Sequence, residues 1–264
     1  KIYSLANEKG IQMPTLPALL KDGYKIGHKG QYPSDLQMVY SNLTPRNTRR
    51  PDAPEGTVLL GLQAFCQKWL VNDFRRNFFK QDRAYVCQTY QRRVESYLGH
   101  AVDVSHIGAL HDLEHLPILV KALPEGTLVP YGVPAFTIQS TRDGFGWVTN
   151  LLETLISAEM WGPCTSATTA LGFRREFERF AKLTGSDPAF VDWQGHDFSM
   201  RGMMGVEAAK LSGIGHLLFF KGTDTLPALD LIEDYYDADC TKELVGMSVD
   251  ATEHSVMCVG SAVA

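Results

Sequence analysis

The chain has 264 residues, of which 44% are hydrophobic and 21% are charged, and its formal net charge is −5 at pH 7. This composition is ordinary for a globular protein, and the negative balance argues against a general attraction to nucleic acid or to anionic membranes. The sequence contains no apolar run of bilayer-spanning length, and residues 1–10 lack the layout of a signal peptide.

The first two thirds of the chain predict an α+β domain. Apolar residues recur at helical spacing over 60–79 and over 82–98, where Gly99 is the expected C-cap. Runs of strand-forming residues between turn signals then predict three short strands, at 117–123, 127–129 and 133–139. Two further helices are expected at 147–160 and 166–183.

Strands and helices alternate after Pro188. The expected strands are 191–199, 215–220 and 244–249, and the expected helices are 204–211, 226–236 and 253–263. Such alternation implies a parallel sheet or barrel, so we divide the chain into domains over 1–186 and 187–264. A closed barrel usually needs eight such units. Three units predict either a small open sheet closed by partner contacts or a part of a longer polypeptide.

A short polar signature follows each of these strands. The signatures are GHDFSMRG at 195–202, KGTDT at 221–225 and EHS at 253–255. Loops at the carboxyl ends of successive strands of a β/α barrel open onto one face, so Phe198, Arg201, Asp224 and His254 are expected to converge there. The residues alone therefore indicate a small-molecule enzyme on an α/β scaffold and leave the reaction open.

Other patterns carry less chemistry. His111 to His115 fits the H-x-x-E-H pattern of inverted zinc peptidases, but Pro117 leaves no room for the helix that pattern needs, so we predict a polar loop. The basic run from Arg46 to Arg50 is either a solvated surface or part of a binding site for an anionic substrate. The five scattered cysteines form no Cys-x-x-Cys pair, which favours small core thiols and a reducing, cytoplasmic compartment.

Six groups of residues, in order along nearly the whole chain, carry a family resemblance. They are DGYKIGHKGQYP at 22–33, KALPEG at 121–126, TNLLET at 149–154, HDFSMRG at 196–202, FKGTDT at 220–225 and EHS at 253–255. Together they resemble the amino-terminal half of the nicotinamide phosphoribosyltransferase family. Members of that family continue well past the position that matches Ala264, and their RPDSG-like ribose- and phosphate-binding segment is not in this sequence.

The resemblance implies an amino-terminal α+β domain that contributes to dimerisation and the active-site rim. After it would come the first three units of a β/α-barrel-like, type II phosphoribosyltransferase domain, with the barrel incomplete in this chain. The implied reaction joins nicotinamide to phosphoribosyl pyrophosphate, giving nicotinamide mononucleotide and pyrophosphate in NAD salvage. Mg²⁺ would neutralise the diphosphate and ATP would be a stimulating co-substrate. A homodimer is implied, and a second chain could supply the missing carboxyl-terminal half.

The resemblance also implies roles for the base-binding residues. Phe198 would stack on one face of the pyridine ring, and Tyr24 from the second subunit would stack on the other. Asp224 would accept a hydrogen bond from the carboxamide NH2 group. Nicotinate carries a carboxylate at that position, and two anions in a partly dry pocket repel each other. Asp224 is thus the residue that favours the amide over the acid.

Further roles follow from the same resemblance. Arg201 would hold the substrate and its phosphate, and Arg46 would contact phosphates across the dimer. His254 would be phosphorylated by ATP, with Glu253 as its neighbour, and Asp22 would lie near the nicotinamide entrance. Two alternatives stay open. One is a relative that uses nicotinate; the other is a catalytically incomplete half that binds a partner or ligand.

Overall fold

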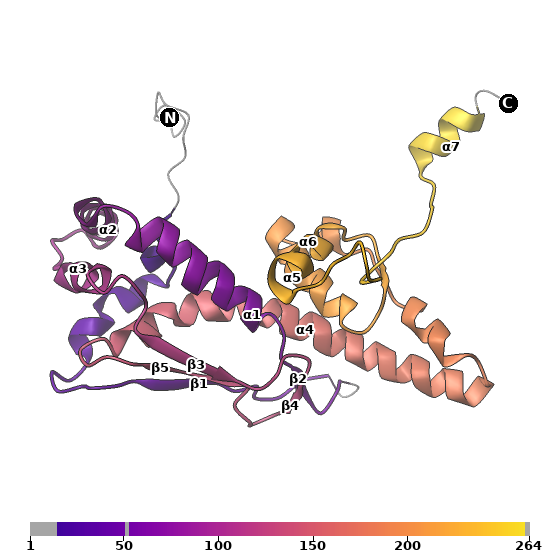
Figure 1. Ribbon diagram of the computed structural model, residues 1–264, viewed down its shortest axis with the longest axis horizontal. Coiled ribbons are helices and arrows are strands. Elements are labelled where there is room, and N and C mark those ends of the chain that lie inside the picture. Colours follow the sequence, from indigo (N-terminus) through magenta and orange to yellow (C-terminus); the bar gives the residue numbers. More distant parts are fainter. Residues whose placement is uncertain (1–14, 51–52, 262–264) are drawn as a thin grey trace. The chain divides into compact units, whose positions relative to one another are not determined.

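The computed structural model describes residues 15–50 and 53–261, and the chain forms two compact units (Figure 1). Unit 1 comprises Lys1–Pro45, Leu62–Leu123 and Val133–Met160. Unit 2 comprises Arg46–Gly61, Pro124–Gly132 and Trp161–Ala264. The boundary that we placed near residue 186 between family domains stays a prediction.

Unit 1 contains a three-stranded antiparallel sheet in the order β1-β5-β3 (Figure 1). The strands are β1 (Tyr40–Leu43), β3 (Ile118–Ala122) and β5 (Phe136–Ser140). In the central strand, Phe136, Ile138 and Ser140 are buried and alternate with half-buried residues, as expected for a sheet with one face on the core. The strands predicted at 117–123 and 133–139 are confirmed.

A continuous helical segment covers the predicted range 60–79. It begins as α1 (Leu62–Phe65) and continues as two π-helical stretches, η3 (Cys66–Asp73) and η4 (Arg75–Phe79). Phe74 and Phe78 are fully buried and anchor this segment in the core of unit 1. The sequence predicted a helix here but gave no sign of its wide π winding.

Two α-helices and two 3-10 segments complete the first part of unit 1. They are η1 (Pro17–Leu19), η2 (Gly23–Gln31), α2 (Arg83–Leu98) and α3 (Ser105–His111). The backbone amide of Tyr85 donates to Asp82 Oδ1 at the start of α2, and Gly99 ends α2 with a φ of 78°. The prediction of a helix over 82–98 with Gly99 as its cap is confirmed.

The H-x-x-E-H pattern forms a turn. Helix α3 ends at His111. Glu114 has a φ of 61°, a left-handed conformation that does not occur inside a right-handed helix. His111 Nε2 donates to the Gln81 carbonyl, at 2.9 Å, and so holds the start of this turn. The predicted polar loop is confirmed.

Helix α4 (Trp147–Thr184) is one helix where the sequence predicted two. We expected a break between 160 and 166, a range that includes Pro163. A proline inside a helix costs one backbone hydrogen bond. Burial of Met160, Cys164 and Ala167 on both sides of Pro163 offsets that loss, and the helix continues. Its first part belongs to unit 1 and the remainder to unit 2.

Unit 2 begins with the antiparallel pair β2 (Gly56–Val58) and β4 (Leu128–Pro130), in which Thr57 lies opposite Val129. The strand predicted at 127–129 is confirmed. Later in the chain come η5 (Pro188–Trp193), β6 (His196–Asp197), η6 (Met200–Gly202), α5 (Val206–Leu217), β7 (Gly222–Thr223), α6 (Pro227–Tyr236) and α7 (His254–Ser261).

The alternation of strands and helices is confirmed, and β6 and β7 pair in parallel with His196 opposite Gly222. Met247 adds an isolated parallel bridge to Gly222. The range predicted as a strand at 191–199 begins in the 3-10 helix η5 and contains only β6, and 244–249 contains only the bridge residue Met247. The strand predicted at 215–220 was wrong, because β7 lies after it at Gly222–Thr223. Residues 215–217 end helix α5, because its buried face packs on α4 and the apolar run continues that face. The described residues form three adjoining parallel segments and no closed barrel.

Candidate functional site

The carboxyl ends of β6 and β7 bring an imidazole and a carboxylate together. His196 Nε2 lies 3.1 Å from Asp224 Oδ1, and the Asp224 backbone amide donates to the Asp197 carbonyl at 2.9 Å. Gly222 makes this approach possible, because a Cβ atom at that position would lie 2.7 Å from His196 Nδ1. The parallel register therefore places two of the predicted polar signatures beside each other.

An aromatic face adjoins this pair. The rings of His196 and Phe198 are stacked, with centroids 4.5 Å apart and an interplanar angle of 29°. Phe198 is 65% exposed, so its ring is held by stacking while much of its surface stays open. An exposed aromatic surface next to a carboxylate is suited to a flat heterocycle that carries a hydrogen-bond donor.

The environment of Asp224 favours its ionised form. The Ser248 hydroxyl donates a hydrogen bond to Asp224 Oδ1, and His196 contacts the same oxygen. These contacts, with the nearby positive charge of Arg201, hold the pKa of the Asp224 carboxyl below its ordinary value. At neutral pH the group is therefore a hydrogen-bond acceptor only.

Beneath this site lies a small group of buried oxygens. The Ser199 backbone amide donates to Asp197 Oδ1 at 2.9 Å, which fixes the turn that carries Phe198. Asp197 Oδ2, Ser199 Oγ and Thr225 Oγ1 are buried and make no aligned hydrogen bond within the described residues. Burial raises the pKa of Asp197, but the hydrogen bond from the Ser199 amide and the nearby hydroxyls of Ser199 and Thr225 lower it by a larger amount, so the net direction is downward.

In unit 1, the segment with Asp22 and Tyr24 is bound to the first part of α4. Thr154 Oγ1 donates to Asp22 Oδ2 at 2.7 Å, and His28 Nδ1 lies 3.0 Å from Asn150 Oδ1. Tyr24 is 66% exposed and meets the His28 ring edge-on, with centroids 5.1 Å apart. Hydrogen bonds thus connect two of the segments that carried the family resemblance, 22–33 and 149–154.

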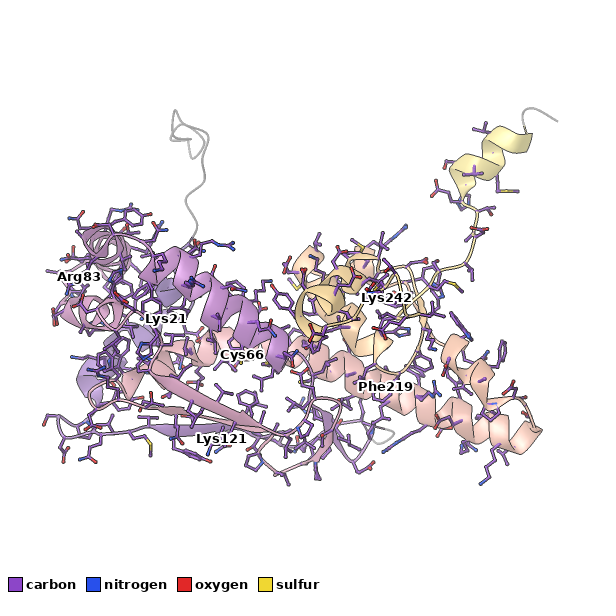
Figure 2. All side chains as sticks on the ribbon, viewed as in Figure 1. Lys21, Cys66, Arg83, Lys121, Phe219 and Lys242 are labelled. Carbon is purple, nitrogen blue, oxygen red and sulfur yellow. The ribbon has the colours of Figure 1, made fainter. Side chains whose placement is uncertain are left out.

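An ion pair between a buried lysine and an exposed glutamate anchors the same segment. Lys25 is only 5% exposed, and its Nζ lies 2.5 Å from Glu153 Oε2. Burial lowers the pKa of Lys25, but the hydrogen bond and charge of Glu153 outweigh burial and leave the pKa above its ordinary value. Next to it, Lys21 Nζ donates to the Tyr90 hydroxyl at 2.8 Å; Figure 2 labels Lys21 among the side chains.

The remaining predicted residues lie outside the Phe198–Asp224 group. Arg46 is exposed in the loop after β1, and residues that follow it line a cavity of about 430 Å³ with threonines of α4. His254 is the first residue of α7, and Glu253 accepts a hydrogen bond from the Ser255 hydroxyl. Among the described residues, no hydrogen bond, ion pair or ring contact joins Arg46 or His254 to Asp224.

Sequence reasoning gave His196 and Ser248 no role, although both contact Asp224. His196 stood inside the HDF signature, and its place opposite Gly222 follows only from the parallel register. Ser248 lies in the range predicted as a strand at 244–249, in which only Met247 pairs with Gly222. Its hydroxyl could not be placed before that pairing was known.

Two family models match separate parts of the chain. Residues 17–108 match "Nicotinamide phosphoribosyltransferase, N-terminal domain", and residues 193–264 match the "Nicotinate phosphoribosyltransferase (NAPRTase) family". A nicotinamide phosphoribosyltransferase of Acinetobacter baylyi is 47% identical over 245 residues, which is 91% of this chain and 48% of the relative. The chain belongs to the nicotinamide phosphoribosyltransferase family.

The chain spans about half the length of the family members that it matches. A nicotinamide phosphoribosyltransferase of Xanthomonas campestris is 30% identical over 89% of this chain and 47% of its own length. One of Mycoplasma genitalium is 28% identical over 90% of this chain and 52% of its own length. Because residues 17–108 match the family's amino-terminal domain, the chain corresponds to the amino-terminal part.

A solved structure supports the fold. The crystal structure of human nicotinic acid phosphoribosyltransferase aligns with a TM-score of 0.57 and 21% identity, over 91% of this chain and 40% of that chain. At this identity the likeness establishes the fold alone. It agrees with a mixed α/β chain that combines the family's amino-terminal domain with the start of the following domain.

No helix in the described ranges combines the length and apolar character that crossing a bilayer requires.

Proposed function

We propose that this chain supplies the amino-terminal half of a nicotinamide phosphoribosyltransferase. The observation that carries the proposal is the Asp224 carboxylate, 3.1 Å from His196 Nε2, beside the stacked rings of Phe198 and His196. In the reaction, the pyridine nitrogen of nicotinamide forms a bond to C1 of the ribose. The bond from C1 to the pyrophosphate oxygen breaks, and pyrophosphate leaves with the electron pair.

The base would be recognised by stacking and by one hydrogen bond. Phe198 offers an open aromatic face, and Tyr24, which is also exposed, would reach the other face of the ring from the second subunit of a homodimer. Asp224 would accept a hydrogen bond from the carboxamide NH2 group. Nicotinate would place a second carboxylate against this ionised group, which disfavours the acid.

The remaining roles rest on the family resemblance. Arg201, whose charge acts on Asp224, would hold the substrate and its phosphate, and Arg46 would contact phosphates across the dimer. His254 would accept a phosphoryl group from ATP beside Glu253. Asp22, at the start of η2, would lie near the nicotinamide entrance. These residues supply alignment and charge, which are the main sources of catalysis when positive charge develops on a sugar.

Mg²⁺ would enter bound to the diphosphate of phosphoribosyl pyrophosphate. The described residues contain no group of three or more His, Cys, Asp or Glu side chains that could hold a metal ion. ATP would act as a stimulating co-substrate. The same proposal includes a closed type II barrel and a cytoplasmic location. It also includes a carboxyl-terminal half, which is either covalently attached or supplied by a second chain.

A chimera tests the proposal. The 264 residues would be fused to the carboxyl-terminal half of the Acinetobacter baylyi relative, and nicotinamide mononucleotide formation would be measured with nicotinamide or nicotinate in competition. We expect nicotinamide to be preferred. Asp224→Ala should lower the preference for nicotinamide over nicotinate at least about tenfold, because a charge-assisted hydrogen bond is lost.

The matched control is Asp230→Ala, which removes an exposed carboxylate from helix α6. It should leave the ratio of the two activities unchanged. Preferred use of nicotinate by the unmodified chimera would establish the nicotinate alternative instead. An unchanged ratio in Asp224→Ala would remove Asp224 from base recognition.

A further inference from the structure

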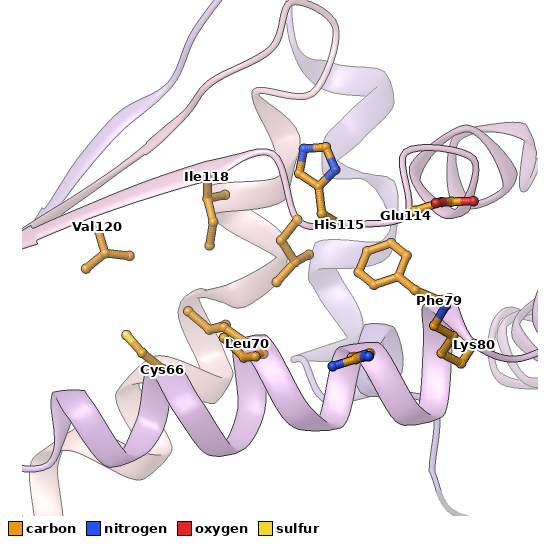
Figure 3. A pocket seen from close by; sticks show the side chains of 11 residues that line it. Cys66, Leu70, Phe79, Lys80, Glu114, His115, Ile118 and Val120 are labelled. Atoms are coloured by element: carbon orange, nitrogen blue, oxygen red, sulfur yellow. The ribbon is translucent and has the colours of Figure 1, made fainter. Parts of the chain in front are cut away.

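Unit 1 contains a cavity of about 580 Å³ between the helical segment η3–η4 and the chain that enters β3 (Figure 3). The helical wall consists of Cys66, Leu70, Val71, Arg75, Phe79 and Lys80. The opposite wall is formed by residues 114–116, Ile118 and Val120. This volume is within the range of pockets that hold small organic ligands.

The π winding of the helix creates the helical wall. A π-helix bonds residue i to residue i+5 and winds more widely than an α-helix, so residues five apart diverge less in direction than they would in an α-helix. Leu70, Arg75 and Lys80 have this spacing, and all of them line the cavity. In an α-helix, with 3.6 residues per turn, residues five apart would point about 140° away from each other. The wider winding therefore helps to turn Leu70 and Arg75 toward the same wall, and Lys80 follows directly after the end of η4.

The cavity has an apolar end and a polar end. Figure 3 shows Cys66, Ile118 and Val120 toward one end, and Lys80 and Glu114 toward the other, with Phe79 beside them. His115 Nδ1 donates to the Leu113 carbonyl at 2.7 Å, which holds this ring in the middle of the lining. A ligand that fits both ends has an apolar body and a polar head group.

The charges of the lining select the sign of that head group. Arg75 and Lys80 bring two positive charges, and Glu114 brings one negative charge. Neither basic side chain forms an ion pair with a carboxylate within the part of the chain that the structure describes. The cavity thus has an excess of positive charge in a chain whose net charge is −5.

We propose that this cavity binds a small amphipathic anion, in which an aromatic or short aliphatic body carries one carboxylate or sulfonate. The body would lie against Leu70, Ile118 and Val120, and the anionic head would face Arg75 and Lys80. This site is separate from the proposed base-binding residues, none of which lines the cavity. Its function would be to bind a ligand other than the substrates of the transfer reaction.

The test uses the complete 264-residue chain and two fluorescent probes of similar size. The anionic probe is 1-anilinonaphthalene-8-sulfonate, and the neutral probe is N-phenyl-1-naphthylamine. We expect the anionic probe to bind saturably and more tightly than the neutral one. The double variant Arg75→Gln with Lys80→Gln should weaken binding of the anionic probe at least about tenfold, since two charged partners are removed.

Two further variants complete the test. Ile118→Trp should fill the apolar end and abolish saturable binding of both probes. Arg92→Gln with Arg93→Gln removes the same charge from the exposed surface of α2 and should leave binding unchanged. Circular dichroism establishes that each variant is folded, and Lys80→Gln alone replaces the double variant if that one does not fold. The proposal would be overturned if the two probes bind with equal affinity, or if the α2 variant weakens binding of the anionic probe as much as the cavity variant does. Saturable binding that persists in Ile118→Trp would also overturn it.

Discussion

The Asp224 carboxylate faces the His196 imidazole across the parallel pair β6–β7, with Oδ1 and Nε2 3.1 Å apart. The same imidazole is stacked on Phe198, and the same carboxylate oxygen accepts the Ser248 hydroxyl. His196 therefore couples the stacking face to the hydrogen-bond acceptor. A change that moves this one ring is expected to disturb both parts of the proposed base site.

Gly222→Ala tests this coupling. The new Cβ atom would lie 2.7 Å from His196 Nδ1 and 2.9 Å from the Gly195 carbonyl oxygen, so the ring must move. We expect a destabilisation of about 1–3 kcal/mol, as for other overpacked sites, and a loss of most transfer activity in the chimera. Thermal unfolding and nicotinamide mononucleotide formation measure the two effects. Gly162→Ala in α4, where no atom lies within 4 Å of the new Cβ, should keep full activity.

Ser248→Ala should change the pH dependence of nicotinamide use. The Ser248 hydroxyl is the main cause of the lowered pKa of Asp224, so its removal raises that pKa toward the ordinary value. The ionised carboxylate is then lost at a higher pH as the solution is acidified. The acid limb of kcat/KM for nicotinamide in the chimera should therefore move to higher pH. The control is Thr184→Ala, which deletes an exposed hydroxyl. If the acid limbs of the two variants lie at the same pH, Ser248 does not have this role.

Glu153→Gln should loosen the segment that carries Asp22 and Tyr24. Lys25 would keep its buried charge and lose its carboxylate partner, which we expect to lower the free energy of unfolding by about 1–3 kcal/mol. Limited trypsin digestion after Lys21, Lys25 or Lys29 should also become faster. Glu159→Gln, on the same helix, is the control for a lost negative charge. Equal stability and digestion rates in the two variants would show that the ion pair contributes nothing.

The stability of unit 1 should depend on His106 between pH 4 and 6.5. Burial lowers the pKa of His106 from 6.5 to about 4, and the positive charges of Lys21 and Lys29 lower it in the same direction. The negative charge of Asp103 favours protonation and opposes them. The His106 ring packs edge-on against Tyr90 and Trp147. The unfolded chain therefore binds a proton in this range that the folded chain does not, and stability falls as the pH falls from 6.5 to 4, by up to about 3 kcal/mol.

The variant His106→Gln should remove this part of the pH dependence. Thermal unfolding at pH 7 and at pH 5 measures it, and His100→Gln, which changes an exposed ring, is the control. The difference in melting temperature between the two pH values should shrink in His106→Gln and stay as in the unmodified chain in His100→Gln. The same difference in both variants would assign the pH dependence to other groups.

Patterns of local origin were predictable from the sequence. Helix α2 was predictable from Asp82, Gly99 and the apolar spacing between them, because capping and periodicity depend on residues that are close in sequence. Contacts across long sequence distances were not predictable. The continuation of α4 through Pro163 depends on burial against other segments, and the short length of β7 depends on how α5 packs. Phe198 and Asp224 could be chosen from their place after strands, whereas His196 and Ser248 required the parallel register.

The contacts between 22–28 and 150–154 have an evolutionary consequence. Asp22, Lys25 and His28 meet Thr154, Glu153 and Asn150 respectively, across more than 120 positions of sequence. Substitutions in one stretch change the partners of the other, so the two are expected to vary together among relatives. A graft of residues 22–28 from a distant homologue should therefore function well only when the matching side chains of α4 are transferred with it.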